Sequence, residues 1–466
     1  MSNQPNIILF LTDDHARWAL GAYDDPYVLT PNLDYMARNG VLMKEASTPN
    51  PVCSPARACL FTGRIPSQHG IHDYLGNTPN RDENKHWLKE EVPIQALFKK
   101  GGYETALIGK WHLGQEHTDK EHFDYSFTIG TEYPILHGEN RTFYKGSEKV
   151  ECEGSLTRTI TNEALRYLKE RDRSKPLFLV IGHYATHSQW QGHRERLVDY
   201  YRQKNIVTRD QTQNYSFGSQ RNESLDATRN NPIEALSQYY AAVSQIDESV
   251  GSVLDEIEGQ KLMDQTLFVY TSDHGLNCGD HGLWGKGNAT YPLNLLDRSI
   301  QVPLVFYGPE ILFNRQKRSE MVNHTDLFQT LLDIGEIKES EEEKQKRNSP
   351  GISFAPALTN GSSLTNWKTE QFYEYGPVRM IRTKKYKLIL YPDSANNLLI
   401  DLVNDPDEIE NLYREESYGK IIEVLKTKIN IFFDQFTSDH FDGVKCLDTL
   451  PQYNSLQAWE PEKERK

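Results

Sequence analysis

The sequence has few cysteines and lacks any long hydrophobic run. Its 466 residues include five cysteines, an odd number at wide intervals (Cys53, Cys59, Cys152, Cys278 and Cys446). This argues against both a disulfide framework and a zinc cluster. The longest apolar runs, such as those at 7–11 and 177–181, have the length of a strand. They are far shorter than the roughly 20 residues of a membrane helix, so we expect that no segment of this chain spans a membrane.

Basic residues are outnumbered by acidic ones. There are 52 Lys and Arg residues against 66 Asp and Glu residues, which gives a formal net charge of -14 at pH 7. No basic stripe is present to neutralise phosphates, so the composition argues against a nucleic-acid-binding protein. An acidic protein can still bind an anion in a local positive pocket. The N-terminus lacks the basic segment and apolar core of a secretory signal, and this predicts a cytoplasmic location.

Strand-like runs alternate with helical patterns along the chain. The alternation is seen in "PNIILFLTDDH", "TPNLDYMARNG", "ETALIGKWHLG", "TRTITNEALRYLKERD" and "KPLFLVIGHYATH". It predicts an α/β fold with a large, mostly parallel sheet sandwiched by helices. The length is sufficient for one large domain and a smaller one.

Four of the predicted strands are followed by charged or titratable side chains (Asp13 and Asp14; Lys110 and His112; His183 and His187; Asp273 and His274). Each pair alone is also typical of a helix cap or of solvated surface. The carboxyl ends of parallel strands meet at one edge of a sheet, so all four pairs should lie near one another. The presence of four such pairs favours a binding site at that edge. Three carboxylates with one histidine suit Ca²⁺, with Mg²⁺ or Mn²⁺ as alternatives, and suit zinc less well.

The stretch "PVCSPARACLFTGR" predicts a short helix directly after a cysteine. Ser54 is a suitable N-cap, Pro55 suits the first helical position, and Gly63 can end the helix. Cys53 would then lie at the positive end of the helix, where an anion is favoured, with Arg57 beside it.

Two other interpretations of this cysteine are weaker. A buried structural cysteine fits Cys59, inside the predicted helix, better than it fits Cys53. The loop of cysteine phosphatases requires an arginine six positions after the nucleophile, and position 59 is another cysteine. The phosphatase interpretation is therefore excluded.

The segment from Cys53 to Arg57 resembles the signature of type I sulfatases, which belong to the alkaline-phosphatase-like superfamily. In that signature Cys, Pro and Arg at alternating positions mark the cysteine for oxidation to formylglycine. The resemblance extends over nearly the whole chain through "LTDDH", "GKWHLG", "HYATH", "TSDHG" and "GLWGKG". Thr186 stands where many relatives have Pro. The Asp273-His274 pair, where others have Asp-Asn, is similar to iduronate and choline sulfatases and to phosphonate monoester hydrolases.

The resemblance also implies two domains and a set of site residues. "VRMIRTKKYKLIL" and "LLIDLVNDPDEIENLY" are similar to a C-terminal α+β subdomain with an antiparallel sheet. We therefore expect a catalytic domain at 1–365 and a subdomain at 366–466. The implied ligands of a Ca²⁺ ion are Asp13, Asp14, Asp273, His274 and the modified Cys53. The implied catalytic residues are Cys53, Arg57, Lys110, His112, His187 and Lys286, and the implied substrate-binding residues are Lys110, His183, His187 and Lys286.

The implied reaction is hydrolysis of a sulfate ester. A hydrated formylglycine at position 53 would attack sulfur, His187 would protonate the leaving alcohol, and His112 would assist release of sulfate. The expected substrate is a sulfated mono- or oligosaccharide, and a maturation enzyme that generates formylglycine is the expected partner. A phosphonate or phosphate monoester hydrolase with the same centre, and an inactive binder of sulfated ligands, are the alternatives. Segments 115–153 and 191–231 are expected to be irregular; they would either shape the pocket or be solvated insertions.

Overall fold

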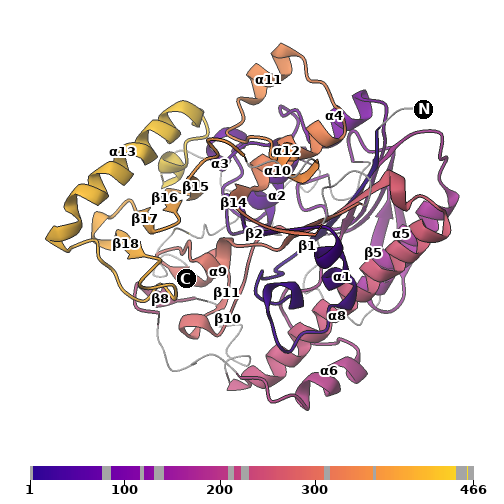
Figure 1. Ribbon diagram of the computed structural model, residues 1–466, viewed down its shortest axis with the longest axis horizontal. Helices are drawn as coiled ribbons and strands as arrows, with labels where there is room; N and C mark the ends of the chain where they lie inside the picture. The colour runs from indigo at the N-terminus through magenta and orange to yellow at the C-terminus, as the bar shows by residue number, and fades with distance from the viewer. Residues whose placement is uncertain are drawn as a thin grey trace.

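The structure is a computed structural model that describes residues 4–75, 85–115, 120–130, 141–207, 215–221, 230–308, 315–359, 364–447 and Trp459. A ten-stranded sheet crosses the larger part of the molecule (Figure 1). In spatial order its strands are β14 (Gln316–Asn323), β2 (Val41–Ser47), β13 (Leu304–Tyr307), β9 (Thr266–Ser272), β1 (Asn6–Thr12), β7 (Leu177–Gly182), β3 (Glu104–Gly109), β4 (Tyr125–Ile129), β5 (Arg141–Lys145) and β6 (Glu148–Cys152).

The five central strands, from β9 to β4, are parallel to one another. β13 is antiparallel to both β9 and β2, and β4, β5 and β6 pair antiparallel at the other edge. The predicted α/β class is confirmed, with a mixed sheet whose parallel part is central. The prediction of an irregular segment at 115–153 is wrong where the structure describes it, because β4, β5 and β6 lie there. The same prediction for 191–231 is wrong at α6 (Glu195–Arg202), which is a helix. Residues 116–119, 131–140, 208–214 and 222–229 of the two predicted loops lie outside the described residues.

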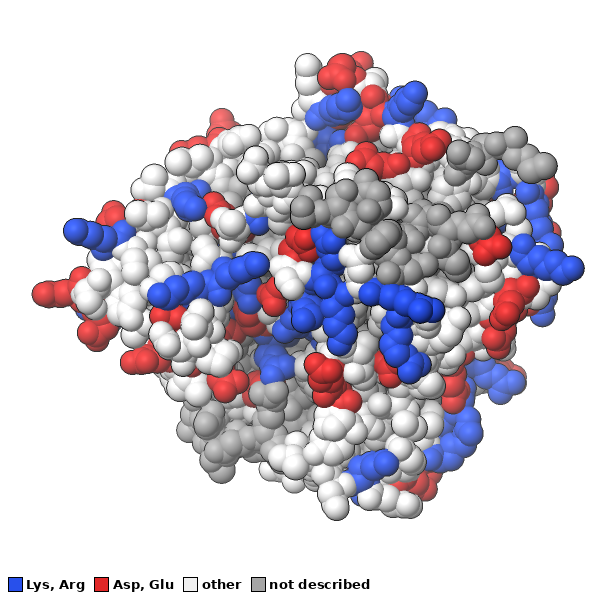
Figure 2. All heavy atoms as spheres, viewed as in Figure 1, with Lys and Arg blue, Asp and Glu red and all other residues white. Residues whose placement is uncertain are grey.

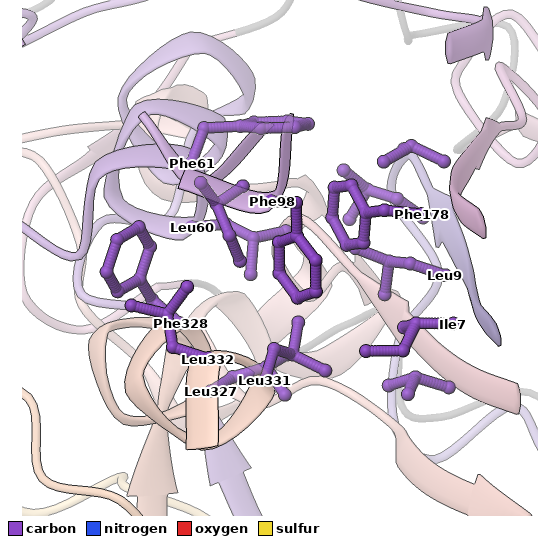
Figure 3. Packing of buried hydrophobic residues seen from close by; sticks show 14 of the residues in the cluster. Ile7, Leu9, Leu60, Phe61, Phe98, Phe178, Leu327, Phe328, Leu331 and Leu332 are labelled. Atoms are coloured by element: carbon purple, nitrogen blue, oxygen red, sulfur yellow. The ribbon is translucent and has the colours of Figure 1, made fainter. Parts of the chain in front are cut away.

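Helices cover both faces of the sheet, which explains why the central strands are apolar throughout. On one face the core joins β1 to α2 (Cys53–Thr62), α4 (Ile94–Lys100) and α10 (His324–Ile334). Figure 3 shows this layer, with side chains of α2, α10, α4 and β1 in one cluster (Leu60, Phe61, Leu327, Phe328, Phe98, Ile7 and Leu9). The other face packs against α1 (Pro31–Asn39), α5 (Leu156–Glu170) and α8 (Pro232–Gly259).

A separate four-stranded antiparallel sheet lies toward the C-terminus, at the left of Figure 1. Its strands are β15 (Glu370–Tyr375), β16 (Val378–Thr383), β17 (Tyr386–Leu390) and β18 (Leu398–Asp401). α13 (Gly419–Phe436) packs on it through Ile422, Leu425, Ile429 and Phe433. The predicted antiparallel C-terminal sheet is confirmed, while the boundary at 365/366 stays a prediction.

The remaining elements are short and mostly lie in the connections. They are η1 (Gly21–Tyr23), α3 (Pro66–His69), α6 (Glu195–Arg202), β8 (Ser219–Gln220), η3 (Met263–Gln265), β10 (Asn277–Cys278), η4 (Asp280–Gly282), β11 (Trp284–Gly285), η5 (Gly287–Ala289), β12 (Thr290–Tyr291), α9 (Asp297–Ile300), α11 (Glu341–Arg347), α12 (Ala355–Thr359), η6 (Ser394–Asn396), η7 (Glu416–Tyr418) and η8 (Gly443–Leu447). Within the described part of the chain, every helix is too short or too polar to cross a membrane.

Buried ion pairs attach the smaller sheet to the larger part. Asp297 of α9 accepts hydrogen bonds from Arg382 of β16 at 2.7 and 2.9 Å, and it forms an ion pair with Lys387 of β17 at 2.5 Å. Lys387 is fully buried and also contacts Glu408. Burial favours the neutral form of Asp297, but the charges of Arg382 and Lys387 outweigh burial and hold its pKa well below its usual range. The carboxylate therefore remains charged between two cations.

Replacing Asp297 with Ala should lower the free energy of unfolding by about 3 kcal/mol, because it leaves two buried cations without one of their counter-charges. Urea unfolding monitored by circular dichroism would measure this loss. Glu341→Ala is a suitable control because its pair with Lys344 is exposed, and it should cost less than about 0.5 kcal/mol. Equal losses in the two variants would contradict a specific role for the buried pairs.

Candidate active site

Helix α2 begins at Cys53 and places that side chain beneath the surface, with 2% of its area exposed. Val52, rather than the predicted Ser54, is the N-cap residue, and Pro55 is the third residue of the helix instead of the first. The Ser54 hydroxyl accepts a hydrogen bond from Leu75 N–H at 3.0 Å. Gly63 ends the helix in the left-handed conformation (φ 67°), as predicted. Cys53 is therefore held at the start of a short helix whose residues are all buried.

The ends of β1, β3 and β9 bring their polar residues to Cys53. Its Sγ lies 3.3 Å from Asp13 Oδ1 and 3.3 Å from His274 Nε2. Lys286, which follows β11, places Nζ 2.9 Å from the same sulfur. Lys110, just beyond β3, forms an ion pair with Asp13. Residues that are far apart in the sequence thus meet within one buried volume.

Four of these residues form a group that could hold a cation. Each of Asp13, Asp14, Cys53 and His274 offers one ligand atom, and these atoms all lie within 4.8 Å of one another. Asp273 lies at the edge of this group. Its Oδ1 is 3.4 Å from His274 Nε2, while its Oδ2 accepts a hydrogen bond from Arg57 Nε at 2.9 Å. Oxygen-rich donors with one imidazole suit a hard divalent cation.

The negative charges of the neighbouring carboxylates change the pKa values of Asp273 and His274. Burial raises the pKa of Asp273 to about 6, and the nearby Asp13 carboxylate adds to the rise. Burial and Lys286 lower the pKa of His274, but Asp273, Cys53 and Asp14 outweigh them and raise it to about 9. A bound cation would relieve the same repulsion.

Three basic side chains balance this negative charge. Burial favours the neutral thiol of Cys53, but Lys110 and Lys286 outweigh burial and hold its pKa well below its usual range. Arg57 donates from Nη1 to the Lys110 carbonyl at 3.1 Å. Its buried Nη2 has no hydrogen-bond partner among the described residues. Position 53 thus has basic groups that stabilise an anion beside the carboxylates of the cluster.

Two of the predicted histidines flank Cys53. His112 donates from Nε2 to the Leu75 carbonyl at 3.0 Å, and its side chain helps to lower the pKa of the Cys53 thiol. His187 contacts the Ser188 carbonyl through Nδ1. Burial lowers the pKa of His187, but the carboxylates of Asp13 and Asp14 outweigh burial and raise it above its ordinary value.

Thr186, one of the two departures from the sulfatase pattern, has a clear structural role. Both its N–H and its hydroxyl donate to the carbonyl oxygen of Asp13, each at 2.9 Å. These bonds tie the loop of His187 to the loop that carries two of the candidate metal ligands. A proline at this position could not donate either bond.

His183 is not placed with the other predicted residues. Its ring is fully buried, and Nε2 lies 3.0 Å from the hydroxyl of Ser249 on α8. Burial lowers its pKa to about 4. His183 follows β7 directly, and its ring lies on the face of the sheet that α8 covers. This geometry gives no support to the prediction that His183 contacts substrate.

Two tyrosines of the site were missed by the sequence analysis. Tyr184 lies under the Lys110 ammonium group, 4.5 Å from Nζ to the ring centre. It is part of the "HYATH" motif, so its position next to a predicted site residue was an available signal. Tyr239 of α8 donates its hydroxyl to the Asp14 carbonyl at 3.0 Å, and no local motif pointed to it.

Comparisons of the sequence and of the structure with known proteins give the same result. A family model described as Sulfatase matches residues 5–337, and a model for the C-terminal part of N-sulphoglucosamine sulphohydrolase matches residues 279–435. An N-acetylglucosamine-6-O-sulfatase of Bacteroides thetaiotaomicron is 24% identical, over 90% of this chain and 84% of that protein. Human N-acetylgalactosamine-6-sulfatase is 27% identical, over 81% of this chain and 70% of its own length.

Solved structures share the fold. One, of a protein in complex with its substrate D-glucosamine-2-N,6-O-disulfate, has a TM-score of 0.80 at 22% identity and covers 94% of this chain and 99% of that chain. A phosphonate monoester hydrolase of Agrobacterium radiobacter has a TM-score of 0.72 at 19% identity, with 94% and 97% covered. At these identities the likeness shows the fold, whereas the family model spans well over half of the chain. The chain therefore belongs to the sulfatase family and is a sulfuric ester hydrolase.

Proposed function

We propose that the protein removes sulfate from a carbohydrate sulfate ester by means of a formylglycine formed from Cys53. The observation that carries the proposal is the position of Cys53, buried at the start of α2 between two ammonium groups and the acidic cluster. Relatives named as N-acetylglucosamine-6-O-sulfatase and N-acetylgalactosamine-6-sulfatase favour an amino-sugar 6-sulfate as substrate.

The cation we propose is Ca²⁺, with Mg²⁺ or Mn²⁺ as alternatives, held by Asp13, Asp14, Asp273 and His274 together with position 53. The hydrated formylglycine would supply a nucleophilic hydroxyl, and the cation would lower the pKa of that hydroxyl. Arg57 orients Asp273 through the hydrogen bond at 2.9 Å.

The basic side chains would bind the reacting group. A sulfate ester carries negative charge on its peripheral oxygens, and Lys110, Lys286 and the unpartnered Nη2 of Arg57 are the basic groups near position 53 that would bind them. Preorganised donors of this kind stabilise charge as it develops, because they need no rearrangement during the reaction.

His187 and His112 would move protons at different steps of the reaction. The carboxylates of Asp13 and Asp14 raise the pKa of His187, which favours the protonated ring that would donate to the leaving alcohol oxygen. Its Nδ1 is engaged with the Ser188 carbonyl, which leaves Nε2 as the donating atom. His112 donates from Nε2 to the Leu75 carbonyl, which leaves Nδ1 as the atom that would accept a proton when sulfate is released.

Maturation by a formylglycine-generating enzyme would have to precede folding. Cys53, Pro55 and Arg57, the residues of the signature, are all buried in the folded chain. A modifying enzyme could not reach them without unfolding α2, so its substrate would be the unfolded chain.

A phosphonate monoester hydrolase remains the second candidate function. The Asp273-His274 pair favours it, and a solved enzyme of that kind shares the fold. Rates on aryl sulfate and aryl phosphonate esters would separate the two. A higher kcat/KM on the phosphonate would replace the sulfatase proposal.

Replacing Cys53 with Ser or Ala should abolish turnover and leave the thermal unfolding temperature nearly unchanged, because the role of the residue is chemical. Serine has a single hydroxyl and cannot regenerate an aldehyde. Turnover of 4-nitrophenyl sulfate would measure the effect, with Cys152→Ser on β6 as the matched control. A loss of tenfold or less in a fully matured preparation would contradict the assignment.

The purified protein should contain one divalent ion per chain at the Asp13–His274 cluster. Metal analysis and anomalous scattering under saturating calcium would locate it. Asp14→Asn should lower the ion content, because it removes one anionic ligand. Asp172→Asn, a change at an exposed turn, should leave the content unchanged. Absence of an ion from the unmodified protein under these conditions would count against the metal site.

The acid role of His187 predicts a dependence on the leaving group. His187→Ala should slow hydrolysis of a sugar sulfate by about 10²- to 10⁴-fold, because a sugar alkoxide leaves poorly without a proton. The same variant should slow nitrophenyl sulfate much less, because nitrophenolate leaves unprotonated. His112→Ala should slow both substrates similarly, since sulfate release is common to both. If His187→Ala slows the two substrates by the same factor, the acid role is wrong and His187 would only bind sulfate.

A further inference from the structure

A hollow lies on the protein surface, outside the candidate active site. It consists of two adjoining cavities of about 520 and 470 Å³, which share Arg17, Glu45, Asp280 and Arg298 in their walls. We call the two together the outer groove. None of the described catalytic or metal-site residues lines it. Its size falls within the usual range of ligand sites.

The loops of the active site also build the outer groove. Arg17 and Trp18 follow Asp13 and Asp14 closely in the chain, and they line the groove. Cys278 and Asp280 do so on the loop that begins with Asp273 and His274. The groove therefore adjoins the catalytic loops.

The walls of the outer groove carry basic and acidic side chains in similar number. Figure 2 shows Lys and Arg side chains clustered near the centre of the face, in the region where Figure 1 places β2 and α9. The basic residues of the groove are Arg17, Lys44, Arg298, Lys317, Arg382 and Lys384. Acidic residues are present as well: Asp24, Asp25, Glu45, Asp280, Asp297, Asp407 and Glu408.

Most of the acidic residues are already engaged within the protein. Asp297 and Glu408 belong to the buried cluster that holds the smaller sheet. Asp280 pairs with Arg298 at 3.3 Å. Glu45 is shared between Arg382, at 3.4 Å, and Arg17, at 3.9 Å. Asp25 accepts hydrogen bonds from two backbone N–H groups and from a tyrosine hydroxyl.

Three lysines of the groove differ from these residues in their contacts. Lys44, Lys317 and Lys384 are exposed, and within the described ranges none of their ammonium groups has an ion-pair or hydrogen-bond partner. Lys317 of β14 pairs in register with Leu42, two residues before Lys44 on β2, so both lysines lie on one face of the sheet. Neighbouring like charges repel unless an anion lies between them.

Aromatic side chains line the first cavity beside these lysines. Trp18, Tyr23, Tyr27 and Tyr240 contribute to its wall. The indole N–H of Trp18 donates to the Leu276 carbonyl at 3.2 Å, which fixes the orientation of the ring. Flat apolar surfaces next to cationic groups suit a ligand with apolar ring faces and anionic substituents, which is the chemistry of a sulfated sugar.

We propose that the outer groove binds a non-reacting stretch of an anionic glycan, with Lys44, Lys317 and Lys384 contacting its sulfate or carboxylate groups. The inference rests on the proposed function, because a carbohydrate sulfatase would meet such chains as substrate. The groove adds affinity for the polymer without taking part in the chemical step.

A triple variant with Lys44→Ala, Lys317→Ala and Lys384→Ala tests the proposal. Its affinity for heparin, a sulfated glycosaminoglycan, would be measured by titration calorimetry in the Cys53→Ala background, so that no turnover occurs. The control is Lys175→Ala, Lys346→Ala and Lys420→Ala, three exposed lysines outside the groove. Both triples remove the same charge from the protein.

The groove triple should bind heparin at least about threefold more weakly at low salt, because three exposed charge contacts are lost. This difference should vanish at an ionic strength of about 0.5 M, where exposed charges are screened. The control triple should bind like the parent. With Cys53 restored, kcat/KM on 4-nitrophenyl sulfate should be unchanged in both.

Equal weakening in the two triples, or none in either, would overturn the proposal. The proposed function fails by a different result, namely no turnover of any sulfate ester by the matured parent. The heparin measurement does not depend on turnover, so the two failures are distinguishable.

Discussion

The pairing of buried charges around Cys53 is the constraint on which the rest of the structure depends. Asp13, Asp273 and His274 are almost completely removed from solvent, and so are the cations Arg57 and Lys110. Charges buried in this way are costly unless each has partners at close range. The fold therefore has to hold separate segments at fixed distances, and the reactivity of the site follows from the same requirement.

The architecture meets this requirement with rigid elements. Parallel strands at the centre of the sheet end at a common edge, so β1, β3 and β9 deliver their polar residues to one place. α2 is anchored against α10 and the sheet by a large apolar cluster, which fixes position 53 from below. The smaller sheet is joined to the larger part through Asp297 and its two cationic partners.

Much of the fold and most of the site could be predicted because the signals are local. Each polar pair directly follows an apolar strand, and helix α2 has its own sequence signature. The features that the sequence could not indicate depend on tertiary contacts. The orientation of His183 toward α8 and the use of Ser54 by Leu75 are set by residues distant in sequence. The outer groove could not be predicted either, since Lys44, Lys317 and Lys384 come together only in the folded chain.

The central claim is that the protein acts through an aldehyde at position 53. The most direct measurement is the mass of the proteolytic peptide that contains Cys53, taken from an enzyme preparation with measured sulfatase activity. The account predicts the mass of formylglycine, in a fraction of molecules that rises and falls with specific activity across preparations. An unmodified cysteine thiol in a fully active preparation would contradict it.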